Sequence, residues 1–160
     1  MIALEKVLAL EPDTSRGAIQ LGIVLIYLGR PAEAIPYFEK SRLVNASWQN
    51  SYFSDRWRGE CELLLGNLDD ALLILRRGHL ANPRAWYTHL LLAATLGLKG
   101  DIEEARATLA DLQKTKPELT SLAKLREINN ALGYQNNPQY AALRESTIYA
   151  GLLAAGLPGD

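Results

Sequence analysis

The sequence has little of what disulfide-bonded, membrane-spanning or secreted domains require. Cys61 is the only cysteine among 160 residues, so an internal disulfide and a thiolate metal cluster are both excluded. The most apolar stretch, residues 21–28, is much shorter than the ~20 residues that cross a bilayer, so no membrane association is expected. Residues 1–6 show no leader with an apolar region and a cleavage site. Together these features predict a cytoplasmic protein.

The charges of the chain are balanced. The sequence contains 17 basic and 18 acidic residues, and the formal net charge is −1. A nucleic-acid-binding domain carries a basic surplus on one face, so no nucleic-acid partner is expected. Hydrophobic residues make up 48% of the chain, which is enough for a substantial core in one domain of ordinary size.

The residues that carry out catalysis or bind metals are few and scattered. His79 and His89 belong to different predicted helices, and a zinc site needs three or four ligands. Cys61 lies among apolar helix residues, which predicts a buried structural thiol. The acidic pairs 69–70 and 103–104 fall in first turns of helices, where they complement the helix dipole. We therefore expect no catalytic residue, no metal and no cofactor.

What the chain does have is a repeated pair of small residues at fixed internal spacing. Each glycine ends one helical pattern and each alanine, five residues later, lies inside the next. The glycines are 37 and then 34 residues apart, and a period in the thirties is typical of stacked helix-turn-helix arrays. The pairs are Gly29 and Ala34, Gly66 and Ala71, and Gly100 and Ala105.

Local signals place the helix ends around these pairs. Glycine takes the left-handed cap conformation without a Cβ penalty, so each of the three glycines should close a helix. Asp101, with Glu104 three residues later, predicts a capping box, and Asn67 or Asp69 is expected to cap the corresponding helix. The repeated alanines should allow two antiparallel helices to approach closely next to the turn.

The pattern resembles the tetratricopeptide repeat, whose unit has about 34 residues. The resemblance covers about two-thirds of the chain. It implies an all-α fold, a right-handed α-α superhelix of about three repeats, with units at 15–48, 52–85 and 86–119. The matching positions are Gly22, Gly29, Ala34, Phe38 and Ser41; Gly59, Gly66, Ala71, Leu75, Gly78 and Pro83; and Ala93, Gly100, Ala105, Leu109 and Pro117.

The chain departs from this family pattern at three places. Three extra residues near 49–51 separate the first two units, and Arg58 and Glu62 stand where the family prefers large apolar residues. The first helix of the second unit is therefore expected to be rotated or extended. Residues 1–13 fit the second helix of a preceding repeat, which suggests that the chain is the C-terminal piece of a longer polypeptide.

Residues 120–160 do not repeat the pattern and are interpreted as C-terminal capping helices. Asn136 or Asn137 with Pro138 should begin the last helix, and Gly156 should end it. The segment 151–158 resembles the end of repeat regions in bacterial adenylate/guanylate cyclase-like signalling proteins. That resemblance implies an alternative function, a regulatory domain of a class III cyclase whose catalytic domain lies upstream.

In the tetratricopeptide family the first helix of each unit lines the concave face, which binds a partner. The resemblance therefore assigns partner binding to Arg16, Ile19, Ile23 and Tyr27 from the first unit, Phe53, Arg56, Glu60 and Leu63 from the second, and Tyr87, Leu90 and Ala94 from the third. Their mixed apolar and charged character suits an amphipathic helix or an extended peptide. Alternatively, the last helix or a second copy of the chain covers several of them, and the sequence does not decide between these readings.

Some members of the family clamp the acidic C-terminal tail of a chaperone with Lys, Asn and Arg. Here those places hold Ile19 and Ile23, then Glu60, then Tyr87 and Leu91, so no affinity for an acidic chaperone tail is expected. The sequence thus predicts a non-catalytic interaction module that binds a protein or peptide, or that associates with itself as a homodimer.

Overall fold

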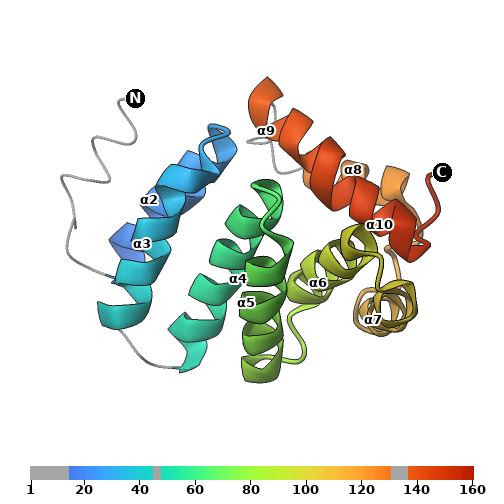
Figure 1. Cartoon of the computed structure of the whole chain (residues 1–160), viewed down its shortest axis with the longest axis horizontal. Helices are drawn as coiled ribbons and strands as arrows, with labels where there is room; N and C mark the ends of the chain where they lie inside the picture. Colours follow the sequence, from blue (N-terminus) through green and yellow to red (C-terminus); the bar gives the residue numbers. More distant parts are fainter. Residues whose placement is uncertain (1–14, 45–47, 131–136) are drawn as a thin grey trace.

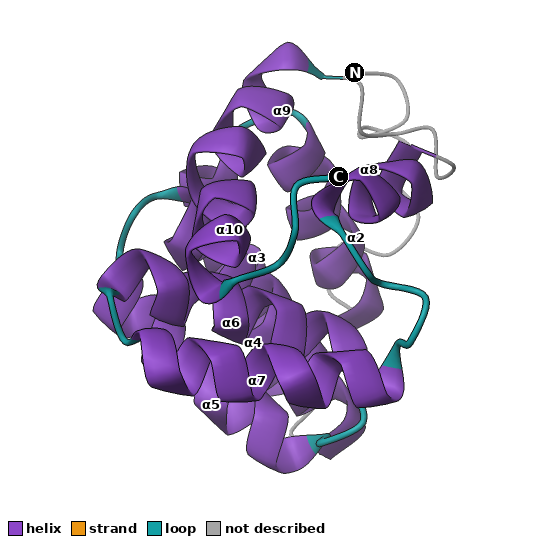
Figure 2. Ribbon diagram, turned by 90° about the vertical axis from the view of Figure 1, so that its right-hand side faces the viewer, coloured by secondary structure: helices purple, strands orange, loops and turns teal. Residues whose placement is uncertain are grey.

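The computed structural model describes residues 15–44, 48–130 and 137–160. In these ranges all the regular secondary structure is helical, and Figure 2 shows the helices joined by loops without a strand. The elements are α2 (Ser15–Tyr27), α3 (Pro31–Val44), α4 (Trp48–Leu64), α5 (Leu68–Ala81), α6 (Trp86–Lys99), α7 (Ile102–Thr115), α8 (Leu122–Asn130), α9 (Pro138–Arg144), the π-helical segment η1 (Glu145–Tyr149) and α10 (Ala150–Ala155).

Consecutive helices pack in pairs, α2 with α3, α4 with α5 and α6 with α7, and each pair follows the last across Figure 1. The turn glycines have φ values of 74° at Gly29, 80° at Gly66 and 88° at Gly100. They therefore take the left-handed conformation that the spacing predicts. The paired alanines, Ala34, Ala71 and Ala105, have no exposed surface, as close packing beside each turn requires.

Small residues on the first helix of a pair leave room for a large residue on the second. A Cβ added at Gly22 would lie 2.4 Å from Cζ of Phe38, and one added at Gly59 would lie 2.6 Å from the Leu75 side chain. Both glycines are therefore required by packing rather than by a turn. The resemblance to the tetratricopeptide pattern is thus confirmed at the level of side-chain contacts within the first two pairs.

The predicted side-chain caps of α5 and α7 are wrong. Asn67 and Asp101 precede these helices with ψ of 69° and 62°, and neither side chain makes a capping hydrogen bond. The backbone N–H of each donates instead to the helix before it, to Glu62 O at 2.9 Å and Leu96 O at 3.0 Å. These bonds complete a Schellman motif. The backbone is then held away from the extended conformation that an N-cap side chain needs.

Asn137 caps α9 as the sequence predicts. It has an extended backbone, with ψ of 122°, and its side chain accepts hydrogen bonds from the backbone N–H groups of Gln139 and Tyr140 at 2.9 and 3.2 Å. α9, η1 and α10 follow one another without a break and form one helix over residues 138–155, called here the C-terminal helix. Gly156, with φ of 100°, ends it.

The chain after the C-terminal helix turns back to α8. Backbone N–H groups of Leu122 and Ala123 donate to the carbonyls of Pro158 and Gly159 at 2.8 and 3.1 Å. On the other side, α10 packs on α6. The C-terminal helix therefore lies between α8 and the helix pairs, so that residues 137–160 belong to the body of the protein.

The predicted units can be placed against these helices. Unit 15–48 contains α2 and α3, unit 86–119 contains α6 and α7, and α8 with the C-terminal helix falls in 120–160. α4 begins at Trp48, ahead of the unit 52–85 that also contains α5. The predicted remnant at 1–13 lies outside the described residues. None of the described helices has the length and apolar character that crossing a membrane demands.

Candidate partner-binding groove

The residues assigned to the concave face divide into three groups in the structure. Glu60, Leu63, Leu90 and Ala94 have no exposed surface, and Ile19 is buried in the core. Ile23, Tyr27, Arg56 and Tyr87 are half-buried, whereas Arg16 and Phe53 are exposed. Two of the buried residues, Glu60 and Ala94, are covered by the C-terminal helix, and Phe53, Arg56 and Tyr87 line a cavity beside it.

Glu60 is the buried polar centre of the covered part of the groove. The hydroxyl of Tyr140, from α9, donates a hydrogen bond to its Oε1 at 2.9 Å. Its Oε2 lies 3.2 Å from Nη2 of Arg56, one turn earlier on α4. A buried carboxylate is costly unless it is paired and hydrogen-bonded. The Tyr140 hydroxyl and the Arg56 guanidinium therefore offset part of this cost, and Oε2 has an ion pair but no hydrogen bond.

Aromatic rings also surround Tyr140. Its contacts, chiefly Glu60 and Tyr27, are called here the Tyr140 socket. The ring of Tyr27, at the end of α2, meets the Tyr140 ring edge to face at 5.3 Å, and it meets Trp57 in the same way at 6.0 Å. Arg144 is buried one turn after Tyr140, with its guanidinium 5.3 Å from the Tyr140 ring centre and 4.7 Å from that of Tyr149. Burial and the charge of Glu60 raise the pKa of Tyr140, so its hydroxyl stays a hydrogen-bond donor.

The α10 end of the C-terminal helix is held by backbone contact instead. A Cβ added at Gly151 would lie 2.1 Å from the carbonyl oxygen of Ala94, and one added at Gly97 would lie 2.1 Å from the carbonyl oxygen of Gly151. Real Cβ atoms do not approach so closely, so both positions require glycine. With Leu152 and Ala155 buried beside them, these residues close one end of the groove tightly.

The opposite end of the groove is open. Between the N-terminal parts of α4 and α6 lies a cavity of about 270 Å³ lined by Tyr52, Phe53, Arg56, Ala85, Trp86, Tyr87 and Thr88. Four of these seven side chains are aromatic, and Phe53 keeps 37% of its surface exposed. The cavity can therefore accept an apolar or aromatic side chain.

Arg56 connects the open end with the covered part. Its guanidinium lies 3.5 Å from the ring centre of Trp57 and 4.2 Å from that of Tyr87, within the range of cation–π attraction. Burial is the main cause that raises the pKa of Tyr87 to about 12, and the charge of Glu60 adds to it. Tyr87 is therefore neutral at physiological pH.

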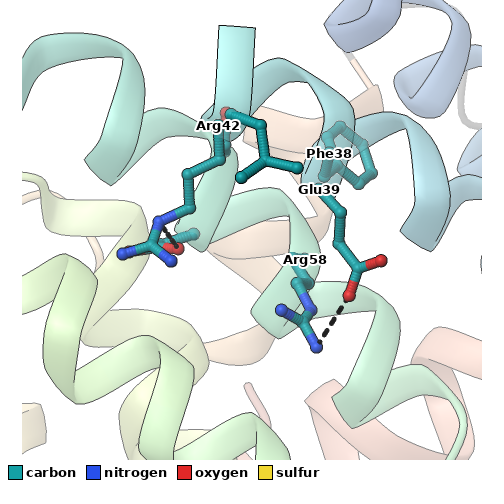
Figure 3. A pocket seen from close by; sticks show the side chains of 7 residues that line it. Phe38, Glu39, Arg42 and Arg58 are labelled. Atoms are coloured by element: carbon teal, nitrogen blue, oxygen red, sulfur yellow. Dashed lines mark ion pairs between the residues drawn. The ribbon is translucent and has the colours of Figure 1, made fainter. Parts of the chain in front are cut away.

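A second cavity, of about 260 Å³, lies between α3 and α4 and is shown in Figure 3. Arg58 and Glu39 face each other across it at 3.2 Å, and Arg42 reaches Asp55 at 3.5 Å. Asp55 also accepts two hydrogen bonds from Arg77 of α5, at 2.7 and 2.5 Å. Polar contacts of this kind explain why Arg58 and Glu62 can stand at positions where the family uses apolar residues, since Arg58 also approaches Glu62 at 3.9 Å.

The two histidines belong to different helices, as predicted, but they are neighbours in space. Their rings meet edge to face at 4.6 Å, because His79 lies near the end of α5 and His89 near the start of α6. Among the described residues, no group of three or more His, Cys, Asp or Glu side chains could hold a metal ion. Cys61 is fully buried, as predicted, and burial raises the pKa of its thiol. The thiol is therefore protonated and unreactive.

Sequence reasoning did not assign Tyr140, Arg144 or Gly151 to the groove. They belong to the segment interpreted as a cap, and nothing in their local spacing indicates that this helix crosses the concave face. One signal was available: Tyr140 and Arg144 are polar side chains on the face of a helix whose other residues at that spacing are apolar or small. Buried polar groups require partners, so this face was a candidate for contact with charged groove residues.

Comparisons with known proteins give the fold and leave the family open. No protein-family model matches the chain, and no curated protein matches it. The crystal structure of PilW, described as a widely conserved type IV pilus biogenesis factor, matches at 25% identity with a TM-score of 0.67, over 94% of this chain and 70% of that one. Two crystal structures of MamA match at 18% identity with TM-scores of 0.65 and 0.64, over 95% and 96% of this chain and 84% and 77% of theirs.

These matches and the helix pairs establish an all-α, tetratricopeptide-like helical-repeat fold. They give no support to the resemblance to nucleotide-cyclase proteins. Folds of this type are typically non-catalytic. The fold is therefore consistent with a protein-interaction scaffold.

Proposed function

We propose that this chain is a non-catalytic scaffold that binds a peptide segment of a partner protein in its concave groove, with the open end as the first point of contact. The observation that carries the proposal is the aromatic cavity lined by Phe53, Arg56 and Tyr87, because all three were assigned to the partner-binding face on sequence grounds. Buried aromatic and arginine side chains dominate the binding energy of protein interfaces.

The cavity also limits what the partner presents. A volume of about 270 Å³ accepts one large apolar or aromatic side chain. The Arg56 guanidinium already covers the ring faces of Trp57 and Tyr87. The partner therefore supplies an apolar side chain that meets the exposed Phe53 and the half-buried Trp86. Neighbouring residues of the partner peptide then continue along α4 and α6.

A peptide library displayed on phage and selected on the immobilised chain tests this proposal. The affinity of the selected peptides is then measured by fluorescence polarisation for the natural chain and for Phe53→Ser. Loss of an aromatic anchor should weaken binding about tenfold or more. A matched control is Val44→Ser, an exposed position on α3 outside the cavity, which should leave the affinity unchanged. Selected peptides that bind both variants and the natural chain equally well would contradict the proposal.

Self-association is a second candidate function, and exposed leucines favour it. Leu43 on α3 and Leu73 and Leu80 on α5 are 85%, 69% and 79% exposed. Leu73 and Leu80 are seven residues apart and therefore share one face of α5. Sedimentation velocity at several concentrations tests this candidate, with a doubly substituted Leu73→Ser, Leu80→Ser chain as the comparison. A chain that remains monomeric at high concentration would exclude it.

A further inference from the structure

The two halves of the C-terminal helix are held in different ways. α10 closes on α6 through backbone contact at Gly151, with Leu152 and Ala155 buried. α9 buries Tyr140 and Arg144, and its residues Gln139, Ala141 and Ala142 are exposed. Its start lies against the turn of the first pair, where a Cβ added at Gly29 would be 2.6 Å from Cβ of Gln139. α9 thus extends from α4 to α2. Two of its side chains, Tyr140 and Arg144, are buried, and both carry polar groups.

The groove beneath α9 is chemically a site for a phenol. Glu60 presents a fully buried carboxylate oxygen to the Tyr140 hydroxyl at 2.9 Å, and Tyr27 supplies an aromatic edge to the ring. The Arg56 guanidinium lies 3.2 Å from the other carboxylate oxygen, in an ion pair without a hydrogen bond. A permanent core contact at this place would need no ionised group, because an apolar ring in an apolar pocket is at least as stable. The charged acceptor instead selects for a hydroxyl donor at one position.

The π-helical segment lies between the two halves. η1 covers Glu145–Tyr149, directly after the last buried residue of α9. π-helical turns are rare and have weaker hydrogen-bond geometry than the α-helix, and they frequently mark functional sites. Here the segment provides a place where α9 can part from α10 while α10 stays packed on α6.

From these three observations we propose that Tyr140 is a built-in ligand of the groove, and that α9 gives way to a helical segment of a partner protein that places a tyrosine in the same socket. The proposal rests on the proposed function and names the ligand chemistry of the covered part. The partner segment carries a tyrosine with an arginine four residues later, as α9 does. A phosphorylated tyrosine is not expected to fit, because Tyr140 and Glu60 are both buried and the phosphate would lie against the Glu60 carboxylate oxygen.

A labelled peptide with the sequence of residues 137–149 tests the proposal by fluorescence polarisation. In the natural chain the tethered α9 competes at a high effective concentration, so the peptide should bind weakly. Tyr140→Ala vacates the socket, and the peptide should then bind at least tenfold more tightly. Ala142→Ser, an exposed position on the same helix, is the matched control and should bind as the natural chain does. The circular dichroism of each variant shows whether it is folded.

Two altered peptides examine the chemistry of the socket. Tyr140→Phe in the peptide removes the hydroxyl donor to Glu60 and should weaken binding to the Tyr140→Ala chain about tenfold. A phosphotyrosine at the same place should abolish binding. Equal affinity of the three peptides would overturn the proposal, since a nonspecific apolar contact would then explain the binding.

The test separates this inference from the proposed function. Peptides selected at the open end are titrated against the same Tyr140→Ala chain. If these still bind through Phe53 while the 137–149 peptide does not, the inference fails and the scaffold function stands. If the folded chain binds neither, the scaffold function fails as well. Equal binding of the 137–149 peptide to the natural chain and to Tyr140→Ala would also refute the inference.

Discussion

The covered part and the open end of the groove are formed by the same two helices, α4 and α6, yet their chemistry differs. Under α9 the groove offers a buried carboxylate that accepts a hydrogen bond from a hydroxyl, and under α10 it offers backbone that leaves room only for glycine. At the open end it offers aromatic faces and an exposed Phe53. The covered part is therefore selective for its occupant, and the open end is tolerant. One groove can thus combine a specific site with an adaptable one.

Arg56 connects these two regions, because it pairs with Glu60 on one side and lies against Tyr87 on the other. Because the Arg56 guanidinium lies against the Tyr87 ring and beside Glu60, we expect a ligand that displaces Tyr87 to shift the guanidinium as well. The comparison therefore predicts that disturbing the covered part affects stability strongly, and that disturbing the open end affects binding while the fold remains.

The largest effect is expected from Gly151→Leu. Any Cβ at this position meets the carbonyl of Ala94, so the helix must move away from α6 and expose the apolar surface beneath it. We expect a loss of about 3 kcal/mol or more in the free energy of unfolding, measured by urea denaturation. Ala154→Leu adds the same side chain at an exposed position of the same helix and should change stability by less than about 0.5 kcal/mol. Equal losses in both would remove the distinction between the two faces of α10.

A smaller loss is expected from Tyr140→Phe. The ring still fills the socket, but Glu60 Oε1 loses its hydroxyl donor while it stays buried. Leaving a buried acceptor without its partner costs about 1–3 kcal/mol. Urea denaturation measures the loss, and Tyr37→Phe on the half-buried surface of α3 serves as the control. A variant as stable as the natural chain would show that the hydroxyl contributes nothing to holding α9.

Acid is expected to weaken the packing of α6 against α5, where His89 meets His79. Burial, with a further contribution from His79, lowers the pKa of His89 below its usual 6.5, although Asp111 acts in the opposite sense. Between that lowered pKa and 6.5 the unfolded chain binds the proton more readily than the folded chain. Stability should therefore be complete above about pH 6.5 and should fall as the pH drops below it. Urea midpoints from pH 7.5 to 5 measure this, and His89→Gln should flatten the profile.

The smallest effect on stability is expected from Phe53→Ser. Its ring packs edge to face on Trp57 at 6.2 Å but remains partly exposed, so the free energy of unfolding should fall by about 1 kcal/mol or less. The same variant should lose binding of peptides selected at the open end, as described above. A large loss of stability without a loss of binding would reverse the contrast between the two regions.

Much of the fold could be predicted from sequence, because short-range rules decide it. Gly29, Gly66 and Gly100 take the left-handed conformation, and Ala34, Ala71 and Ala105 are buried beside them. The caps at Asn67 and Asp101 could not be predicted as well. The side chains of Asn67 and Asp101 are typical of N-caps. However, each follows a glycine in the left-handed conformation, and the backbone N–H of Asn67 or Asp101 then donates to the preceding helix.

The site was less accessible to sequence reasoning, because it depends on contacts between distant segments. Glu60 and Tyr140 are 80 positions apart, and no local pattern relates them. The assignment of Phe53, Arg56 and Tyr87 to one face comes from the resemblance to the tetratricopeptide repeat, and the structure places all three around one cavity. Which groove residues the C-terminal helix covers depends on the direction of that helix, which the sequence left open. Partner binding by any of these residues stays a prediction.

Hydrogen exchange of the backbone amides in α9 and α10 tests the central claim most directly. If α9 is held at Glu60 and α10 by its contact with α6, Tyr140→Phe should speed exchange of the hydrogen-bonded amides over residues 141–144 and leave those of α10 nearly unchanged. Mass spectrometry of the natural chain and the variant under identical conditions gives both rates. Equal acceleration in α9 and α10 would contradict the claim, because the C-terminal helix would then open as a single unit.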